Sequence, residues 1–218
     1  MTVLSGARML RISAVFAVSS AIQCPPPDFK TQGELEGGFD LKWYTSSKWY
    51  IQQQMIISYL PADYLNCVTA EYSLLDSPTL LGYNIKVMNH AENKDGKPLG
   101  PLTTICAKVV NETAGKLEVS PCFLPTFLAG PYWIVAFDKE AGWALVSGGA
   151  PKNQGTNGCQ TGTGTNDSGL WIFTRKPDRD DALLQKVRGI AAAKGFDVSV
   201  FRDTDESTCR SLQSPLVV

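Results

Sequence analysis

Short runs in which apolar and polar residues alternate with a period of two occur along most of the chain. The run CVTAEYSLL (67–75), for example, places Val68, Ala70 and Tyr72 on one face and mostly polar side chains on the other. Turn sequences such as NKDGKP and NETAGK separate the runs. This pattern predicts an antiparallel all-β fold. The runs cover residues 48–55, 67–75, 83–90, 102–110, 116–123, 132–138, 143–149 and 170–175.

The number of runs sets the expected architecture. Eight antiparallel strands close into an up-and-down barrel whose interior is just wide enough for one small ligand. Only after the last run does a helical pattern appear, over residues 177–195, with Pro177 and acidic residues at its start and Gly195 at its end. We therefore expect an eight-stranded antiparallel barrel with one C-terminal α-helix packed outside it.

Two segments carry no strand pattern. Residues 25–38, PPPDFKTQGELEGG, are rich in Pro and then in Gly, which predicts an extended arm without a helix. Residues 150–169 are twenty residues dominated by Gly, Thr and Asn. A loop of this length in a compact barrel is either part of a mouth or lid, or disordered.

The N-terminal residues have the layout of a secretory signal. Arg8 and Arg11 precede an apolar run and small residues, with Ala21 as the last residue before cleavage. The alternatives are a buried first strand and a lipoprotein anchor at Cys24, which the bulky Gln23 before it disfavours. We therefore divide the chain into a signal or targeting segment (1–21), an N-terminal arm (22–38), a barrel with its helix (39–209) and a tail (210–218). No stretch approaches the ~20 apolar residues of a membrane-spanning helix.

Composition narrows the class of function. A net charge of −1 and a charged fraction of 19% argue against a nucleic-acid partner. The six cysteines behind a signal-like segment favour disulfides, with fifteen possible pairings. None stands in a C-x-x-C pair and the one histidine is His90, so we expect no structural metal site and no cofactor.

Three motifs in this order of elements resemble those of the lipocalin family. FDLKWYTSSKWY (39–50) is similar to the opening motif, although Ser47 replaces its Gly, and YWIVAFDKEAGWALV (132–146) and LWIFTRKP (170–177) are similar to the second and third. The resemblance implies that Arg175 stacks over Trp49 at the closed end of the barrel, and that Trp43 lies in the short helical turn that closes it. A guanidinium on a shielded indole face contributes about 0.5–2 kcal/mol.

Finer similarity points to the apolipoprotein D and bacterial lipocalin branch of that family. The segments QCPPP, NIKVMN, KLEVS and GFDVSVFRDTDESTC carry it. The resemblance implies the disulfides Cys24–Cys159 and Cys67–Cys209. Cys106 and Cys122 have no counterpart there, but they lie symmetrically about Ala114 in a predicted hairpin and could pair across it, unless Pro121 disturbs the register.

A binding lipocalin needs an apolar interior with few polar groups. Alternation places Ile51, Val87 and Phe173 inside, and the resemblance assigns ligand contacts to Tyr72, Asn89 and Trp171. We expect a buried amide at Asn89. We also expect His90 to be exposed on the opposite face, and Gln53 to be either the inward member of the run QQQ (52–54) or part of a solvated face.

The predicted function is transport or storage of a small hydrophobic molecule, either a fatty acid, a sterol, a retinoid or a carotenoid. A second resemblance, to the lipocalin domain of violaxanthin de-epoxidase, implies a carotenoid-modifying enzyme instead. That chemistry needs facing carboxyl groups, whereas this chain has Asn66 and Gly130 at the matching positions and Asp63 as the nearest acid, so we favour a protein without catalysis. A third alternative is an interaction protein whose aromatic side chains fill the barrel.

The same features predict where the protein works. Disulfides and a signal favour a secreted or lumenal protein in an oxidising compartment, which in an alga could be the plastid or thylakoid lumen. Peripheral contact with a membrane or a protein complex stays open. Asn111 and Asn166 head the tripeptides NET and NDS and are glycosylation acceptors on predicted loops.

Overall fold

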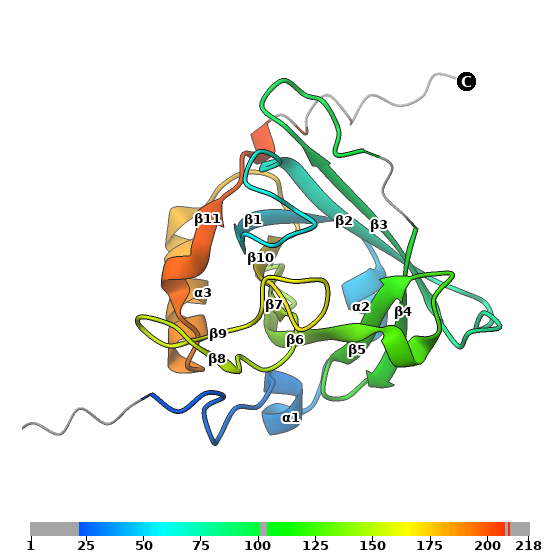
Figure 1. Cartoon of the computed structure of the whole chain (residues 1–218), viewed down its shortest axis with the longest axis horizontal. Helices are drawn as coiled ribbons and strands as arrows, with labels where there is room; N and C mark the ends of the chain where they lie inside the picture. The colour runs from blue at the N-terminus through cyan, green and yellow to red at the C-terminus, as the bar shows by residue number, and fades with distance from the viewer. Residues whose placement is uncertain (1–21, 101–103, 208, 210–218) are drawn as a thin grey trace, which may run out of the picture.

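The computed structural model describes residues 22–100, 104–207 and 209, so the signal segment and the C-terminal tail lie outside it. Eight antiparallel strands follow one another around a closed barrel, which β10 completes by pairing with β1 (Figure 1). This confirms the predicted architecture. The barrel strands are β1 (Trp49–Met55), β2 (Asn66–Leu74), β3 (Ile85–Glu92), β4 (Ile105–Asn111), β5 (Lys116–Pro121), β6 (Gly130–Asp138), β7 (Trp143–Ser147) and β10 (Leu170–Thr174).

Short elements that the alternation did not predict surround this barrel. Strand β11 (Phe201–Asp203) pairs with the outer end of β1, at Gln53–Met55. The pair β8 (Asn153–Gln154) and β9 (Cys159–Gln160) forms a small hairpin in the long loop before β10. Two 3₁₀ turns, η1 (Thr126–Leu128) and η2 (Val198–Val200), complete the list. Runs of two or three residues are too short to show a period.

The N-terminal arm contains a helix, contrary to the prediction. Helix α1 (Gln32–Glu36) begins at a capping box, in which the Thr31 hydroxyl accepts from the backbone N–H of Glu34 and the Glu34 carboxylate accepts from that of Thr31. The Thr31 hydroxyl also donates to the carbonyl of Ala114 in the β4–β5 turn, at 2.6 Å. The spacing T-x-x-E was a readable helix signal, which the flanking Pro and Gly residues masked.

Two further helices lie at the closed end and on the outer side of the barrel. Helix α2 (Leu41–Thr45) is capped by Asp40 and lies inside the ring of strands in Figure 1. Helix α3 (Asp181–Ala193) lies outside the ring, capped by Asp180, and its buried residues Leu184, Val187 and Ala191 face the outer wall. The helix ends just before Gly195, whose φ of 86° suits glycine. Among the residues described, no helix is long and apolar enough to cross a membrane.

The molecule therefore has two apolar cores. One fills the lower barrel around Trp49, Tyr44 and Phe173. The other lies between α3 and the outward side chains of β6, β7 and β10, including Leu145 and Ile172. Side chains on these strands alternate between the two cores, as the pleat requires.

Three disulfides join Cys24 to Cys159, Cys67 to Cys209 and Cys106 to Cys122. The first two are the pairs that the resemblance implies, and the third is the pair that the sequence left open. The last pair does not face directly across the hairpin. Cys106 lies opposite Ser120 because the register shifts between Val109 and Asn111, so its disulfide runs diagonally to Cys122. Pro121 stays in the ladder, opposite Ile105.

Candidate functional site

The closed end of the barrel is sealed by a stack of tryptophan and arginine. Arg175, just after β10, places its guanidinium carbon 3.6 Å from the centre of the Trp49 ring and 5.2 Å from that of Trp43. Its N–H groups donate to the carbonyls of Ser47, Trp43 and Tyr44, and the Trp49 indole N–H donates to the Tyr44 carbonyl at 2.9 Å. Burial lowers the pKa of Arg175 to about 10, which still leaves it charged at neutral pH.

Above this floor three tyrosines join their hydroxyl groups. The Tyr132 hydroxyl lies 2.6 Å from those of both Tyr44 and Tyr72. All three are buried, and burial raises the pKa of Tyr72 to about 12 and those of Tyr44 and Tyr132 well above the ordinary value. The trio therefore stays protonated at neutral pH. Because these hydroxyls satisfy one another, they can lie among apolar groups at little cost.

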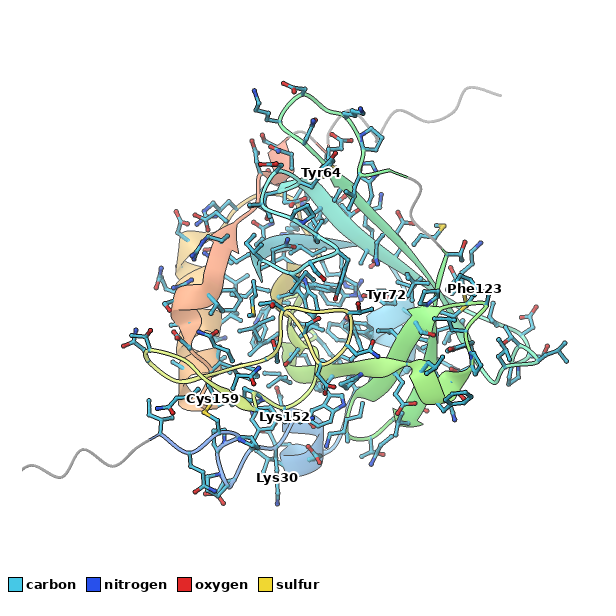
Figure 2. All side chains as sticks on the ribbon, in the orientation of Figure 1. Lys30, Tyr64, Tyr72, Phe123, Lys152 and Cys159 are labelled. Atoms are coloured by element: carbon cyan, nitrogen blue, oxygen red, sulfur yellow. A yellow bond between two sulfur atoms is a disulfide. The ribbon has the colours of Figure 1, made fainter. Side chains whose placement is uncertain are left out.

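A cavity of about 420 Å³ opens above the trio. Its size is in the range of small-molecule sites, and most of its wall is apolar. Tyr72 lies in the interior of the ring of strands in Figure 2. The apolar wall comes from β1 to β5 and β10, and it includes Ile51, Val68, Ala70, Val87, Ala91, Ile105, Val119, Trp171 and Phe173.

Five of the six residues expected to contact the ligand lie on this wall and line the cavity with aliphatic or aromatic side chains. Ile51, Val87, Tyr72 and Phe173 are buried, and Trp171 is half-buried. The Trp171 ring stacks on that of Tyr132, with centroids 6.4 Å apart. A Cβ on Gly169 would lie 2.1 Å from the Trp171 ring, so glycine at that position makes room for the indole. The aromatic side chains thus line a space and do not fill it.

The sixth, Asn89, lies on the wall but is not the buried amide that we expected. Its side chain is exposed, because this part of β3 lies at the rim of the cavity. His90, expected on the far face, is half-buried and is also among the lining residues. Its Nε2 lies 2.7 Å from the Glu92 carboxylate. A shift of register between Asn66 and Thr69 of β2 disturbs the alternation beside these residues.

The glutamine run also differs from the expectation. Gln53 points out of the barrel, where its amide donates to Asp203 and accepts from Arg188 of α3. Gln52 also points outward, with its amide bonded to Thr174 and to two backbone carbonyls. A bulge between Ile51 and Gln53 puts two consecutive residues on the outer side, so Gln54 is the one that lines the cavity. The alternation on which the prediction relied fails at this bulge.

Part of the long loop before β10 covers the mouth of the cavity, and appears yellow across the ring in Figure 1. Residues 165–168 line the cavity from this side. The loop is tied to its neighbours by a few hydrogen bonds: Ser58 N–H donates to Thr163, and the Asn166 amide donates to the Leu128 carbonyl at 3.1 Å. Asp167 also forms an exposed ion pair with Lys152. Such sparse contacts suit a cover that opens.

Beside the mouth, a disulfide and a buried carboxyl hold the start of β2. Glu206 accepts from the N–H of Val68, a cavity residue, at 3.2 Å, and lies against the Cys67–Cys209 disulfide. Burial raises the pKa of Glu206 to about 8. The side chains of Cys67, Glu206 and Cys209 lie close enough together to hold a metal ion, and so do those of Cys67, His90 and Glu92. Since both sulfurs are joined in the disulfide, neither group offers the thiolate that would bind a metal well.

The structure also shows where the residues considered for epoxide chemistry lie. Asn66 begins β2 and is half-buried, while Gly130 begins β6 and is packed so tightly that a Cβ would lie 2.6 Å from the Asn166 side chain. Asp63 is exposed and is not among the lining residues. Neither an amide nor a glycine can donate the proton of a carboxylic acid to an epoxide.

Sequence reasoning missed Gln54, Tyr132, Tyr44 and the cover residues. Tyr132 alternates toward the interior in β6 and Tyr44 belongs to the opening motif that forms the floor, so a search for hydroxyl groups in these two places could have found them. The role of residues 165–168 depends on where a Gly-rich loop settles, and a sequence carries no period for that. The two glycosylation candidates are exposed, but Asn166 already uses its amide on Leu128.

Comparison with known proteins agrees with this geometry. No family model matches the chain. Apolipoprotein D of Mus musculus is 28% identical over 188 residues, which cover 86% of this chain and 84% of that protein. The outer membrane lipoprotein Blc of Escherichia coli (strain K12) is 27% identical over 190 residues, or 87% of this chain and 92% of that protein.

Among solved structures, insecticyanin from the tobacco hornworm Manduca sexta superposes with a TM-score of 0.55 at 15% identity, covering 85% of this chain and 87% of that one. At this identity the likeness concerns the fold alone. The closed barrel with its sealed floor and the order of its elements show that this chain has the lipocalin fold, and its sequence is similar to those of apolipoprotein D and Blc.

Proposed function

We propose that the protein binds one small hydrophobic molecule in the barrel cavity and transports or stores it. The observation that carries this proposal is the cavity itself, a space of about 420 Å³ with apolar walls, a sealed floor and a cover. An empty apolar space of this size is costly to keep unless a ligand uses it, because its walls lose packing contacts. Apolar contact area then supplies the affinity.

The volume bears on the ligand class. It lies in the lower part of the range for small-molecule sites, which favours a fatty acid, a sterol or a retinoid. A full-length carotenoid has twice the carbon atoms of a retinoid, and would have to extend past the cover. Tyr72, Trp171, Phe173, Ile51 and Val87 are the residues that we assign to the ligand's apolar part, with Asn89 at the rim.

The setting of this function is a further part of the proposal. Three disulfides and the apolipoprotein D relative fit a secreted protein or another oxidising compartment. Delivery of a membrane-derived ligand would bring the protein into peripheral contact with a membrane or with another protein. The two positions at which epoxide chemistry would need facing carboxyl groups are Asn66 and Gly130, so we propose no catalytic step.

The test is to expose the purified, oxidised protein to a mixed lipid and carotenoid extract, reisolate it and identify what it retains by mass spectrometry. A matched pair of variants makes the test specific. Val119→Trp puts a large ring on the cavity wall, whereas Val110→Trp puts the same ring on an exposed part of the adjacent strand. We expect Val119→Trp to lose the retained compound and Val110→Trp to keep it. Equal retention by both, or none by the wild type, would contradict the proposal.

A further inference from the structure

The side-chain amide of Gln54 is buried and forms no hydrogen bond with the residues that the structure describes. Its exposed fraction is 0%, and among the residues described neither the amide nitrogen nor the amide oxygen has a hydrogen-bond partner. The two glutamines before it have theirs satisfied on the outer side of the barrel. Buried polar groups without partners are rare in native proteins, and each one needs an explanation.

Its position ties that explanation to the cavity. Gln54 is one of the residues that line the cavity and lies opposite Trp171 in the β1–β10 ladder. Trp49 of the floor lies five residues earlier on the same strand, so Gln54 is about 16 Å farther toward the mouth. The next lining residues along the chain, Tyr59 and Leu60, belong to the β1–β2 connection at the mouth.

Several other polar groups on the wall already have partners. On the cover, the Asn166 amide donates to Leu128, Asp167 pairs with Lys152 and the Ser168 hydroxyl donates to Gly164. The Tyr72 and Tyr132 hydroxyls bond to each other at the deep end. Asn89 is exposed, so water satisfies it, and His90 is engaged with Glu92. A buried water needs two to four polar partners, and most of the cavity wall is apolar, so a single water in place of a ligand is a poor explanation for Gln54.

A primary amide presents one donor and one acceptor side by side. The group that satisfies both at once carries an acceptor and a donor in the same arrangement, as a carboxamide or a protonated carboxylic acid does. A carboxylate can accept from the nitrogen but repels the amide oxygen, and an ester leaves that oxygen unpaired. Burial strengthens this discrimination, because a polar group left unpaired in the cavity cannot form a hydrogen bond with water instead.

We propose that Gln54 selects the head group of the ligand, so that the cavity prefers an apolar chain ending in a neutral carboxamide or protonated carboxylic acid, held at the mouth with its chain toward the floor. This inference rests on the proposed function, because it assigns the polar end of a ligand whose apolar part fills the same cavity. It also gives the unpaired amide a role.

The experiment compares ligands that share one chain and differ in the head group. Lauramide, methyl laurate and laurate each displace a fluorescent hydrophobic dye from the wild-type protein at neutral pH. We expect lauramide to bind about tenfold more tightly than methyl laurate, the ratio of one well-placed hydrogen bond. Laurate gains affinity as the pH falls toward the pKa of the bound acid.

Two adjacent variants supply the control. Gln54→Met keeps the length of the side chain and removes its polar atoms, so we expect the preference for lauramide to vanish while the dye still binds. Gln53→Met makes the same change one residue away, on the outer side, and should keep the preference. The unfolding midpoint separates the two roles, since Gln53→Met loses the bonds to Asp203 and Arg188, whereas Gln54→Met of the ligand-free protein loses none.

The outcomes are distinct. A wild type that binds the three ligands equally, or a Gln54→Met variant that keeps the preference, overturns the assignment of Gln54 and leaves hydrophobic ligand binding intact. A marked loss of stability in ligand-free Gln54→Met shows that the amide is satisfied within the protein, and also overturns it. If neither the dye nor any of the three ligands binds the wild type, the proposed function fails and the assignment fails with it.

Discussion

The two ends of the barrel treat their polar groups in opposite ways. At the closed end, the guanidinium of Arg175, the indole N–H of Trp49 and the three tyrosine hydroxyls all have partners within the protein. At the open end, Gln54 has none among the residues that the structure describes, and burial raises the pKa of the Glu206 carboxyl above its ordinary value. The same strands connect both ends, so the difference lies in the side chains and not in the backbone.

The difference shows what each end is for. A floor whose guanidinium, Trp49 indole and tyrosine hydroxyl groups all have partners is rigid and specifies one structure. A mouth with an unsatisfied amide and a sparsely bonded cover is less stable, as segments that bind and release ligands need to be. The comparison leads to predictions of different size for the two ends.

The largest expected effect is at the floor. Trp49→Ala removes a fully buried ring together with the surface on which Arg175 stacks. We expect the free energy of unfolding to fall by about 3–5 kcal/mol, the usual cost of such a core truncation. Denaturant unfolding followed by circular dichroism measures it. A loss smaller than about 1 kcal/mol would show that the floor does not hold the barrel together.

The next effect is a pH dependence at the mouth. The folded-state pKa of Glu206 is raised to about 8 from an ordinary 4.5, so the folded protein binds this proton more tightly than the unfolded chain. Its stabilising contribution is therefore complete below the unfolded pKa and is lost as the pH rises through the folded pKa. We expect Glu206→Gln to exceed the wild type in stability on the order of 3 kcal/mol at alkaline pH and to match it in acid. Parallel unfolding curves at all pH values would contradict this.

A smaller effect is expected at the hydroxyl trio. Tyr132→Phe removes the central hydroxyl and takes away the partner that Tyr44 and Tyr72 share. We expect a loss of about 1–3 kcal/mol in stability, with dye affinity changed less than about twofold. Tyr72→Phe removes only an end member, so thermal melts should show a smaller loss for it. The reverse order would mean that the trio is not centred on Tyr132.

At the mouth, affinity should change more than stability. Trp171→Ala removes ring surface from the cavity wall, and we expect the dissociation constant of a hydrophobic dye to rise about tenfold. Trp133→Ala is the matched control, because that ring lies against Phe29 and Lys116 and is not among the lining residues. Titration of both variants with the same dye measures this difference. Equal dissociation constants for the two variants would show that Trp171 does not contact the ligand.

The smallest effect is expected at Asn89. Its side chain is exposed at the rim, so Asn89→Ala should change dye affinity less than about threefold and stability by less than about 0.5 kcal/mol. The same titration and melt measure both quantities. A tenfold loss of affinity would instead move the polar contact of the ligand from Gln54 to Asn89.

Much of the fold and part of the site could be predicted without coordinates. Val68, Ala70 and Tyr72 alternate so regularly that the barrel and the inward face of β2 follow from the period alone. The errors have different causes. At Gln53 a bulge interrupts the pleat, and one inserted residue reverses the inward and outward assignments beyond it. Asn89 faces the cavity as alternation predicts, but it lies at the rim and is therefore exposed.

The sequence by itself determined the eight strands and the late helix, because periodicity and caps are local properties of the chain. Its resemblance to known motifs indicated the floor residues and two of the disulfides, whereas the structure decided that Cys106 pairs with Cys122. Tertiary structure decided which glutamine faces the cavity, which hydroxyls meet above the floor and where the Gly-rich loop lies. Those outcomes depend on how distant segments pack against one another. A hydrogen bond between Tyr132 and two tyrosines 60 and 88 residues away has no local trace in the sequence.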